Sequence, residues 1–345
     1  MISPATPQEL ADALRELASA RQAIHLGGAF TKTRLGGPIA QADETVSTAN
    51  LRRLLQYEPK DLTISVEAGM PWTELESTLA ANGQMIPLDP LIGPGWENAT
   101  VGGVIGANLS GPRRRLYGTA RDMVIGMTFA TLEGKLVESG GMVVKNVAGL
   151  DMAKLMIGSY GTLAAVAVVN FKLFPIPPAS RTFILEFATA AEAFARRDEL
   201  LKTILPPAAI DIVNWPSSIR MLIRATGNTG ILSRFAQEFA GARSVEGAEE
   251  AALWREVREF TPRFLAANPK GGVVAMRSSL SEMPAIASKL GAAFIARAGS
   301  GVLYAHHASN APTEPIHDPT GIMKKIKHMF DPNELLNKGR LHGYL

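Results

Sequence analysis

Apolar residues in the first half of the chain recur at two spacings, and each spacing predicts a type of element. The segment Thr6-Pro7-Gln8-Glu9 has the features of a helix start, with Thr6 as the cap. The apolar residues that follow lie at helical spacing: Leu10, Ala13, Leu14 and Leu17. Further helices are predicted at 50–56, 71–82, 101–107 and 151–157, and strands at 22–26, 62–67, 123–131, 135–139 and 163–173.

Three prolines, Pro175, Pro177 and Pro178, interrupt this pattern. Because proline cannot donate a hydrogen bond within a central strand, they predict a domain boundary. Beyond them, strands are predicted at 182–187, 209–214 and 219–226, and helices at 190–203, 231–239 and 320–329, with a turn at 331–333. We therefore expect three parts: a first domain at 1–178, a second at 179–311 and a C-terminal segment at 312–345.

Glycines gather in three loops beside apolar segments of the first part. These loops contain Gly27-Gly28, Gly102-Gly103 and Gly158-Ser159-Tyr160-Gly161-Thr162. A glycine loop lets the backbone approach an anionic ligand, and its successive N–H groups can surround a phosphate. The loops together predict a bound dinucleotide. A Rossmann site is excluded because more loop, rather than a long helix, follows Gly28, and no G-x-x-x-x-G-K-[ST] segment indicates a P-loop.

Composition narrows the class of protein. The 345 residues include no cysteine, which excludes disulfides, iron–sulfur ligation and a thiolate link to a flavin within this chain. The net charge is only +3 and the basic residues are scattered, so nucleic-acid binding is not indicated. No apolar run approaches the ~20 residues of a membrane helix, and the first residues lack the pattern of a signal peptide. We expect a cytoplasmic protein, peripheral to the inner membrane only through partner subunits.

Five segments resemble the FAD-binding family of vanillyl-alcohol oxidase and p-cresol methylhydroxylase. The resemblance covers about residues 1–178 and 330–341. The segments are Gly27-Gly28-Ala29-Phe30-Thr31-Lys32; 61–87 with Val66-Glu67-Ala68-Gly69; Thr100-Val101-Gly102-Gly103 through Asp122; Lys145-Asn146-Val147-Ala148-Gly149-Leu150-Asp151 with 158–163; and Phe330-Asp331-Pro332 with Leu336-Asn337-Lys338-Gly339-Arg340.

This resemblance implies an α+β fold. It consists of a two-subdomain FAD-binding domain of the p-cresol methylhydroxylase type, an α+β cap domain and a C-terminal segment that returns to the flavin domain. The cofactor implied is FAD. The residues implied to bind it are Gly27, Gly28, Ala29, Phe30, Thr31, Lys32, Pro90, Thr100, Gly102, Gly103, Ala107, Asn108, Gly111, Gly158, Ser159, Gly161, Thr162 and Asn337. We also expect an ion pair between Arg121 and Asp122 beside the second loop.

Two departures from the family pattern concern the flavin link and a metal. Members with a histidyl flavin have a His just after the first glycines, where this chain has Ala29-Phe30-Thr31, so the resemblance implies non-covalent FAD. Related catalytic subunits carry an H-x-G-D-G-N motif for metal and substrate. This chain has Tyr304-Ala305-His306-His307-Ala308-Ser309-Asn310 in that region, so we expect no metal. Adjacent histidines on a strand face opposite sides, so at most one points into a site.

Within the family, the chain resembles the FAD-binding subunits of bacterial glycolate oxidases. That resemblance implies oxidation of a small 2-hydroxy acid such as glycolate, or relay of its electrons, with a paralogous flavoprotein and an iron–sulfur subunit as partners. The reaction requires a cation for the carboxylate and a base near the hydroxyl. Arg340 is the candidate for the carboxylate, Lys145 could balance the charge of the flavin, Asn337 could hydrogen-bond the flavin ring, and His307 is a further catalytic candidate. Alternatives are a non-catalytic FAD-binding scaffold for a catalytic paralogue, a sugar or lactone oxidase of the same fold and, more weakly, a cell-wall precursor reductase.

Overall fold

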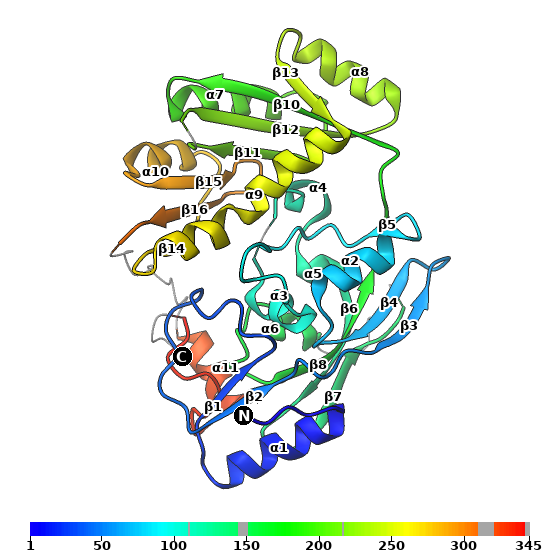
Figure 1. The fold of residues 1–345 in the computed structure, drawn as a ribbon, viewed down its shortest axis with the longest axis vertical. Helices are drawn as coiled ribbons and strands as arrows, with labels where there is room; N and C mark the ends of the chain where they lie inside the picture. Colours follow the sequence, from blue (N-terminus) through cyan, green and yellow to red (C-terminus); the bar gives the residue numbers. More distant parts are fainter. Residues whose placement is uncertain (110, 144–150, 216, 310–320, 342–345) are drawn as a thin grey trace.

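Two antiparallel sheets, one above the other in Figure 1, form the frame of the molecule. The computed structural model describes residues 1–109, 111–143, 151–215, 217–309 and 321–341. The lower sheet has five strands in the order β3-β4-β8-β6-β7, and the upper sheet has seven in the order β13-β10-β12-β11-β15-β16-β14. Separate apolar cores lie on the faces of the two sheets. The predicted α+β class is confirmed.

The five-stranded sheet comes from the first half of the chain. Its strands are β3 (Leu54–Glu58), β4 (Thr63–Glu67), β6 (Val124–Ala130), β7 (Leu136–Gly140) and β8 (Ala165–Lys172). Four of these were predicted, but the helix predicted at 50–56 was wrong. Residues 54–58 instead pair with β4 as an edge strand, with Leu54 and Leu55 exposed on its surface. Hydrogen bonding to a strand that is buried throughout therefore overrode the local apolar spacing.

Each face of the five-stranded sheet is covered by different elements. On one face lie α2 (Trp72–Ala80), α3 (Val101–Ala107), α5 (Ala120–Met123) and α6 (Ala153–Met156), which share a core with β4, β6 and β8. On the other lie α1 (Pro7–Ser19) and the parallel pair β1 (Ile24–Gly27) and β2 (Glu44–Ser47). As predicted, Thr6 caps α1, because its side chain accepts a hydrogen bond from the Glu9 N–H.

Asp122 does not form the predicted ion pair with Arg121. Its carboxylate accepts hydrogen bonds from the N–H and the hydroxyl of Thr119, which completes a capping box at the start of α5. The Arg121 guanidinium donates instead to the carbonyl of Lys154. The local capping geometry was the stronger constraint, since residues 119 and 122 are three apart at a helix start.

The seven-stranded sheet is built from the second half of the chain. Its strands are β10 (Ala179–Phe187), β11 (Ala209–Val213), β12 (Ile219–Gly227), β13 (Arg243–Glu246), β14 (Gly272–Arg277), β15 (Ala293–Arg297) and β16 (Val302–His307). One face packs against α7 (Ala190–Leu201), α8 (Thr229–Glu238) and α10 (Met283–Lys289), and the other packs against α9 (Gly247–Ala267). The predicted elements at 182–239 are confirmed, whereas α9 was not predicted.

Several short elements join the two sheets. The two-residue strands β5 (Gln84–Met85) and β9 (Phe174–Pro175) pair just before the proline-rich link, and β10 begins at residue 179. The short helix α4 (Arg114–Tyr117) lies against β11 of the upper sheet. Leu265 near the end of α9 shares a small core with Leu35, Leu91 and Trp96 of the first domain. The two halves are therefore packed together.

The end of the described chain returns to the first domain. Helix α11 (Ile322–Phe330) lies near β1 in the lower part of Figure 1. Leu336 forms a parallel bridge with Ile24 and joins the core that α1 shares with β8. The predicted helix at 320–329 is thus confirmed to within two residues, and the predicted turn follows it. This return places residues 335–341 beside the first glycine loop.

Candidate functional site

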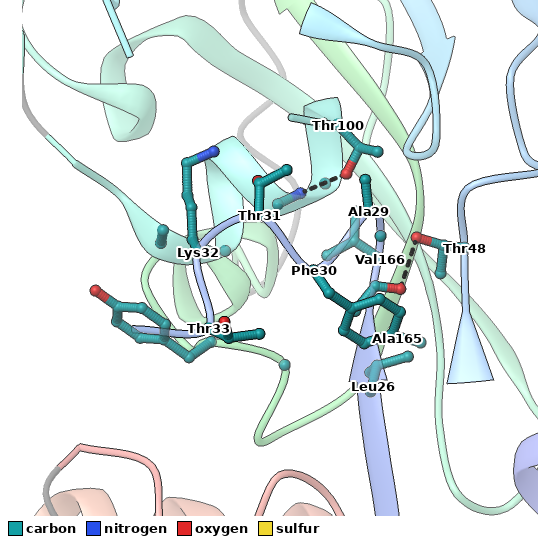
Figure 2. A pocket seen from close by; sticks show the side chains of 18 of the residues that line it. Leu26, Ala29, Phe30, Thr31, Lys32, Thr33, Thr48, Thr100, Ala165 and Val166 are labelled. Carbon is teal, nitrogen blue, oxygen red and sulfur yellow. Dashed lines mark hydrogen bonds between the residues drawn. The ribbon is translucent and has the colours of Figure 1, made fainter. Parts of the chain in front are cut away.

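A pocket lies where the three glycine loops meet, and Figure 2 shows it from close by. The hollow, together with the solvent space open above it, amounts to about 760 Å³. Residues of β1 and the first loop, of α3, and of the start of β8 form its walls. The lining residues are 25–33, Thr48, Thr100, Gly102, Gly103, Gly106, Ala107, 159–161, 164–166 and Arg340.

The first loop supplies unpaired backbone donors. None of the N–H groups of residues 28–33 has a hydrogen-bond partner within the described parts of the chain. The loop also approaches α3 closely, because a Cβ built on Gly28 would lie 2.1 Å from the Thr100 hydroxyl oxygen. The loop admits only glycine at its contact with Thr100. Its six successive N–H groups, which have no partner among the described residues, can together bind an anion.

The second loop contributes in a different way from the one expected. The N–H groups of Val101, Gly102 and Gly103 donate to Met70 O, Ala68 O and the Thr100 hydroxyl, so these donors are already used. The expectation that the Gly102 and Gly103 amides face the ligand was therefore wrong. What α3 offers is a surface without side chains, since a Cβ on Gly106 would meet no atom within 4 Å.

The third loop turns sharply beside the pocket. Tyr160 and Gly161 have φ angles of 52° and 70°, in the left-handed region that favours glycine. A Cβ on Gly161 would lie 2.8 Å from the Asn337 amide nitrogen. Thr162 is fully buried, and its hydroxyl donates to Ser159 O. This loop thus places Ser159, Tyr160 and Gly161 at the pocket wall and turns Thr162 inward.

The charged groups of the pocket are all basic. Lys32, His25 and Arg340 line it, and none of the described lining residues is Asp or Glu. Lys32 is 8% exposed, lies 5.5 Å from the centre of the Trp96 ring and has no hydrogen-bond partner for its Nζ among the described residues. Burial lowers the pKa of Lys32 to about 8. Burial, with a smaller effect of Arg340, also lowers the pKa of His25.

Arg340 holds the chain that follows the first loop. Its guanidinium donates to the carbonyls of Thr33, Leu35 and Gly37, and it lies 5.7 Å from the centre of the Tyr160 ring. Burial is the main cause that lowers the pKa of Arg340. These contacts give Arg340 a positioning role for residues 33–37 at the edge of the pocket.

Asn337 joins the first and third loops. Its amide oxygen accepts from the Leu26 N–H at 2.8 Å, and its amide nitrogen donates to Leu26 O and Tyr160 O at 2.9 and 2.7 Å. Both donors of the amide are thus satisfied by the backbone. Asn337 does not line the pocket, and its contacts fix the two loops relative to each other.

The predicted site residues divide into three groups. Thirteen of them line the pocket: Gly27, Gly28, Ala29, Phe30, Thr31, Lys32, Thr100, Gly102, Gly103, Ala107, Ser159, Gly161 and Arg340. Seven do not line it: Pro90, Asn108, Gly111, Gly158, Thr162, His307 and Asn337. Lys145 lies outside the described residues.

Several lining residues were not predicted. His25, Thr33 and Tyr160 are sequence neighbours of the predicted loops, and this adjacency was the available signal. Thr48 and residues 164–166 reach the pocket only because β1 pairs with β2 and because β8 begins beside the third loop. No local pattern marks them.

The two histidines of β16 face opposite sides of the upper sheet, as predicted. His306 is buried between Phe260 and Phe264, and its Nε2 is 2.8 Å from the Thr261 hydroxyl. Burial lowers the pKa of His306 to about 4. His307 is only partly buried and points away from this cluster, so its position does not support the catalytic role assigned to it. Within the described ranges, no group of three His, Asp or Glu side chains is arranged to hold a metal ion.

A second hollow lies between α2, β5 and the strands β10 and β12. Two arginines line it, and each already contacts a carboxylate: Arg113 pairs with Asp89, and Arg224 pairs with Glu250. The pocket at the glycine loops, with its unpaired donors, is therefore the candidate site.

Comparison with known proteins identifies the family. A family model of the FAD binding domain matches residues 1–140. The chain is 33% identical over 258 residues to glycolate oxidase subunit GlcE of Escherichia coli, covering 73% of this chain and 68% of that protein. The chain belongs to the family of FAD-binding glycolate oxidase subunits. Members of this family are FAD-linked oxidoreductases, and this chain is one of them.

Other relatives match over shorter parts of their length. Glycolate oxidase subunit GlcD of Bacillus subtilis is 25% identical over 69% of this chain and 48% of its own length. Mitochondrial D-lactate dehydrogenase 1 of Saccharomyces cerevisiae is 31% identical over 59% of this chain and 33% of its own length. The chain thus spans about half and about a third of the length of these two relatives.

Solved structures share the fold of this family member. An alkyldihydroxyacetonephosphate synthase superposes with a TM-score of 0.72 at 17% identity, covering 97% of this chain and 75% of that one. The 4-ethylphenol oxidase of Gulosibacter chungangensis has a TM-score of 0.72 at 14% identity, covering 99% and 88%. At these identities the likeness shows the fold alone. No described helix of this chain combines the length and apolarity needed to cross a bilayer.

Proposed function

We propose that the pocket holds FAD non-covalently, with the diphosphate of the cofactor against residues 28–33. The observation that carries this proposal is the run of six backbone N–H groups that no described residue accepts from, in a pocket whose described lining includes no carboxylate. The Thr31 hydroxyl and the Lys32 ammonium are further donors in the same loop. Bound FAD would supply a two-electron acceptor. Gly106 of α3 would leave room for the cofactor by having no side chain.

We propose further that the protein is the FAD-binding subunit of an oxidase or dehydrogenase for glycolate or another small 2-hydroxy acid. In this reaction the carbon bearing the hydroxyl loses a hydride equivalent and the hydroxyl loses a proton, which yields glyoxylate from glycolate. This chain would either carry out that oxidation or relay its electrons. The names of GlcE and GlcD support this assignment, since both are called glycolate oxidase subunits.

The same proposal assigns a role to each part of the chain and names the subunits that would bind to it. Residues 1–178 would bind FAD, residues 179–311 would form the cap, and residues 312–345 would pack back on the first domain. A paralogous flavoprotein and an iron–sulfur subunit would complete the complex and bring it to the inner membrane. Lys145 remains a predicted site residue.

A non-catalytic FAD-binding scaffold is the second candidate. It is favoured by the contacts of the proposed catalytic residues, since Arg340 is bound to three backbone carbonyls and His307 lies outside the pocket. His25 and Lys32 are the described lining side chains that could still take a proton. A catalytic paralogue would then perform the oxidation while this chain holds its own FAD.

Anaerobic reduction separates these candidates. The purified protein should be yellow and should release FAD on denaturation. Glycolate or D-lactate should bleach the flavin of the isolated chain if it oxidises the acid itself, whereas bleaching only with the partner subunits present would support the scaffold or relay. Bleaching by a sugar or lactone instead would support an oxidase of that class. A colourless protein that cannot be reconstituted with FAD would refute the proposal.

A further inference from the structure

Lys32 differs from the other buried lysine of the described structure. The Lys327 ammonium, at 3% exposure, donates to Thr162 O and Leu336 O and pairs with Asp331 at 2.5 Å. The Lys32 ammonium is buried to a similar extent but has no hydrogen-bond or ion-pair partner in the described ranges. One lysine is thus part of the folded framework, and the other carries a charge that the framework does not balance.

An unbalanced buried ammonium is costly for the folded state. Removing a charge from water without a partner costs several kcal/mol, unless the group loses its proton. The Trp96 ring, 5.5 Å away, offsets only part of that cost. A buried charge in this position indicates a ligand of opposite charge.

The part of the pocket wall that the structure describes offers Lys32 no anionic partner. The other titratable residues that line the pocket are His25, Tyr160 and Arg340, and no carboxylate is among them. Towards Trp96 the neighbouring core is apolar, formed by Leu35, Leu91 and Leu265. The free N–H groups of residues 28–33 lie in the same loop, and Figure 2 shows Lys32 extending from it alongside Thr31. An anionic group of the ligand would therefore balance the charge that no described residue balances.

We propose that Lys32 is the cation that pairs with the diphosphate of the bound dinucleotide, and that this pairing makes retention of the cofactor depend on pH. The inference rests on the proposed binding of FAD in this pocket. The diphosphate is favoured over a negative charge on the flavin ring, because Lys32 belongs to the loop whose free amides suit a phosphate.

The direction of the pH effect follows from the state of Lys32 before binding. Its pKa is about 8 in the empty pocket, because burial disfavours the ammonium. Pairing with an anion favours the ammonium and raises this pKa. Below pH 8 the lysine is already charged, whereas above pH 8 binding must first return a proton to it. The affinity should therefore fall by up to about tenfold per pH unit above pH 8.

The test measures the affinity of the full chain, freed of cofactor, for FAD and for ADP at pH 7 and pH 9.5. ADP carries the diphosphate without the flavin. Wild-type protein should lose at least tenfold in affinity for both ligands between the two values. Lys32→Met should bind both about 10–100-fold more weakly at pH 7, since a charge-assisted contact is lost, and should lose the pH dependence. Lys60→Met, an exposed matched variant, should behave as wild type.

A second variant and a melting measurement distinguish loss of the Lys32 charge from misfolding. Lys32→Arg keeps a charge that does not titrate in this range, so its affinity should change little between pH 7 and pH 9.5. Cofactor-free Lys32→Met should unfold at a higher temperature than cofactor-free wild type, because the uncompensated charge is gone. A higher melting temperature also excludes misfolding as the reason for weak binding.

The possible results separate the inference from the proposed function. If wild-type protein binds neither FAD nor ADP, the proposed function fails. If it binds FAD but Lys32→Met has the same affinity and pH profile, the role of Lys32 is overturned. If Lys32→Met weakens only FAD and not ADP, the cation faces the flavin and the assignment to the diphosphate is wrong.

Discussion

Single residues far apart in the sequence fix the pocket, and Asn337 is the clearest example. We expect Asn337→Gly to lower the free energy of unfolding by about 2–4 kcal/mol, because three hydrogen bonds to the backbone of Leu26 and Tyr160 are lost. Glycine is chosen because residue 337 has a φ of 45°, which alanine would strain. Urea denaturation measures the change. Asn333→Gly, at an exposed position of the same segment, is the matched variant, and an equal loss there would contradict this account.

His306 makes the stability of the upper sheet sensitive to acid. Its pKa is about 4 in the folded protein, because of burial, and the ordinary value is 6.5. Between these values the unfolded chain binds a proton that the folded chain does not, so stability is full above pH 6.5 and falls towards pH 4. The loss amounts to about 3 kcal/mol at most. We expect His306→Gln to reduce the slope of unfolding free energy against pH in this window, and an unchanged slope would refute the prediction.

At the scale of elements, α3 and the first loop lie in contact, and Gly28 and Gly106 serve different roles there. A Cβ on Gly28 would collide with Thr100, whereas a Cβ on Gly106 would enter the pocket without meeting protein. We expect Gly106→Ala to keep or raise the melting temperature, since alanine favours a helix by about 1 kcal/mol over glycine, while weakening FAD binding at least tenfold. Thermal melting measures the stability of the variant, and titration with FAD measures its affinity for the cofactor.

Gly28→Ala should instead lower both the melting temperature and the affinity for FAD. The new methyl group must displace the Thr100 hydroxyl, which caps α3. Thr100→Ala in the Gly28→Ala background should restore part of the FAD affinity, because it removes the colliding oxygen. Equal effects of Gly28→Ala and Gly106→Ala on melting temperature would show that the contact is not as described.

The sequence was sufficient for elements that are determined locally. The cap at Thr6 and the strands predicted at 123–131 and 135–139 depend on neighbouring residues, and they formed as predicted. The edge strand β3 was missed because its pairing with β4 decides its conformation. Helix α9 was missed because its buried face includes Glu250, Thr261 and Pro262, which do not stand out as apolar.

In the candidate site, too, the features that depend on neighbouring residues could be predicted, and those that depend on distant segments could not. The three glycine loops carry a local pattern, and most of their residues do line one pocket. The surroundings of Lys32 could not be predicted, because they depend on which distant segments fold around it, and the described ones bring no carboxylate to the pocket. The contacts of Asn337 span 311 residues of sequence and likewise leave no local signal.

At the scale of the whole molecule, Arg34 links the two halves beside the pocket. Its guanidinium donates to four carbonyls at the end of α9, those of Leu265, Asn268, Pro269 and Gly271. Acceptors at a helix C-terminus are well matched to a cation. The first loop is thereby tied to the second half of the chain directly after Lys32 and Thr33.

We expect Arg34→Ala to loosen this link without unfolding either half. Amide hydrogen exchange at residues 265–271 should become at least tenfold faster, since four carbonyls lose their donor. Exchange in β4 and β8 should stay unchanged. Arg255→Ala, at an exposed position of α9 without a hydrogen bond or ion pair to the described residues, should leave exchange at 265–271 as in wild type.

The return of residues 335–341 to the first glycine loop has a consequence for biosynthesis. Ribosomes make the chain from the N-terminus, so the loop at 27–33 leaves the exit tunnel long before Asn337 and Arg340 are translated. Until then the hydrogen bonds that join Asn337 to Leu26 and Tyr160, and Arg340 to the carbonyls of Thr33, Leu35 and Gly37, cannot form. The pocket can therefore close around its ligand only after residues 337–340 have been translated, and a nascent chain stalled before residue 337 should not capture a flavin.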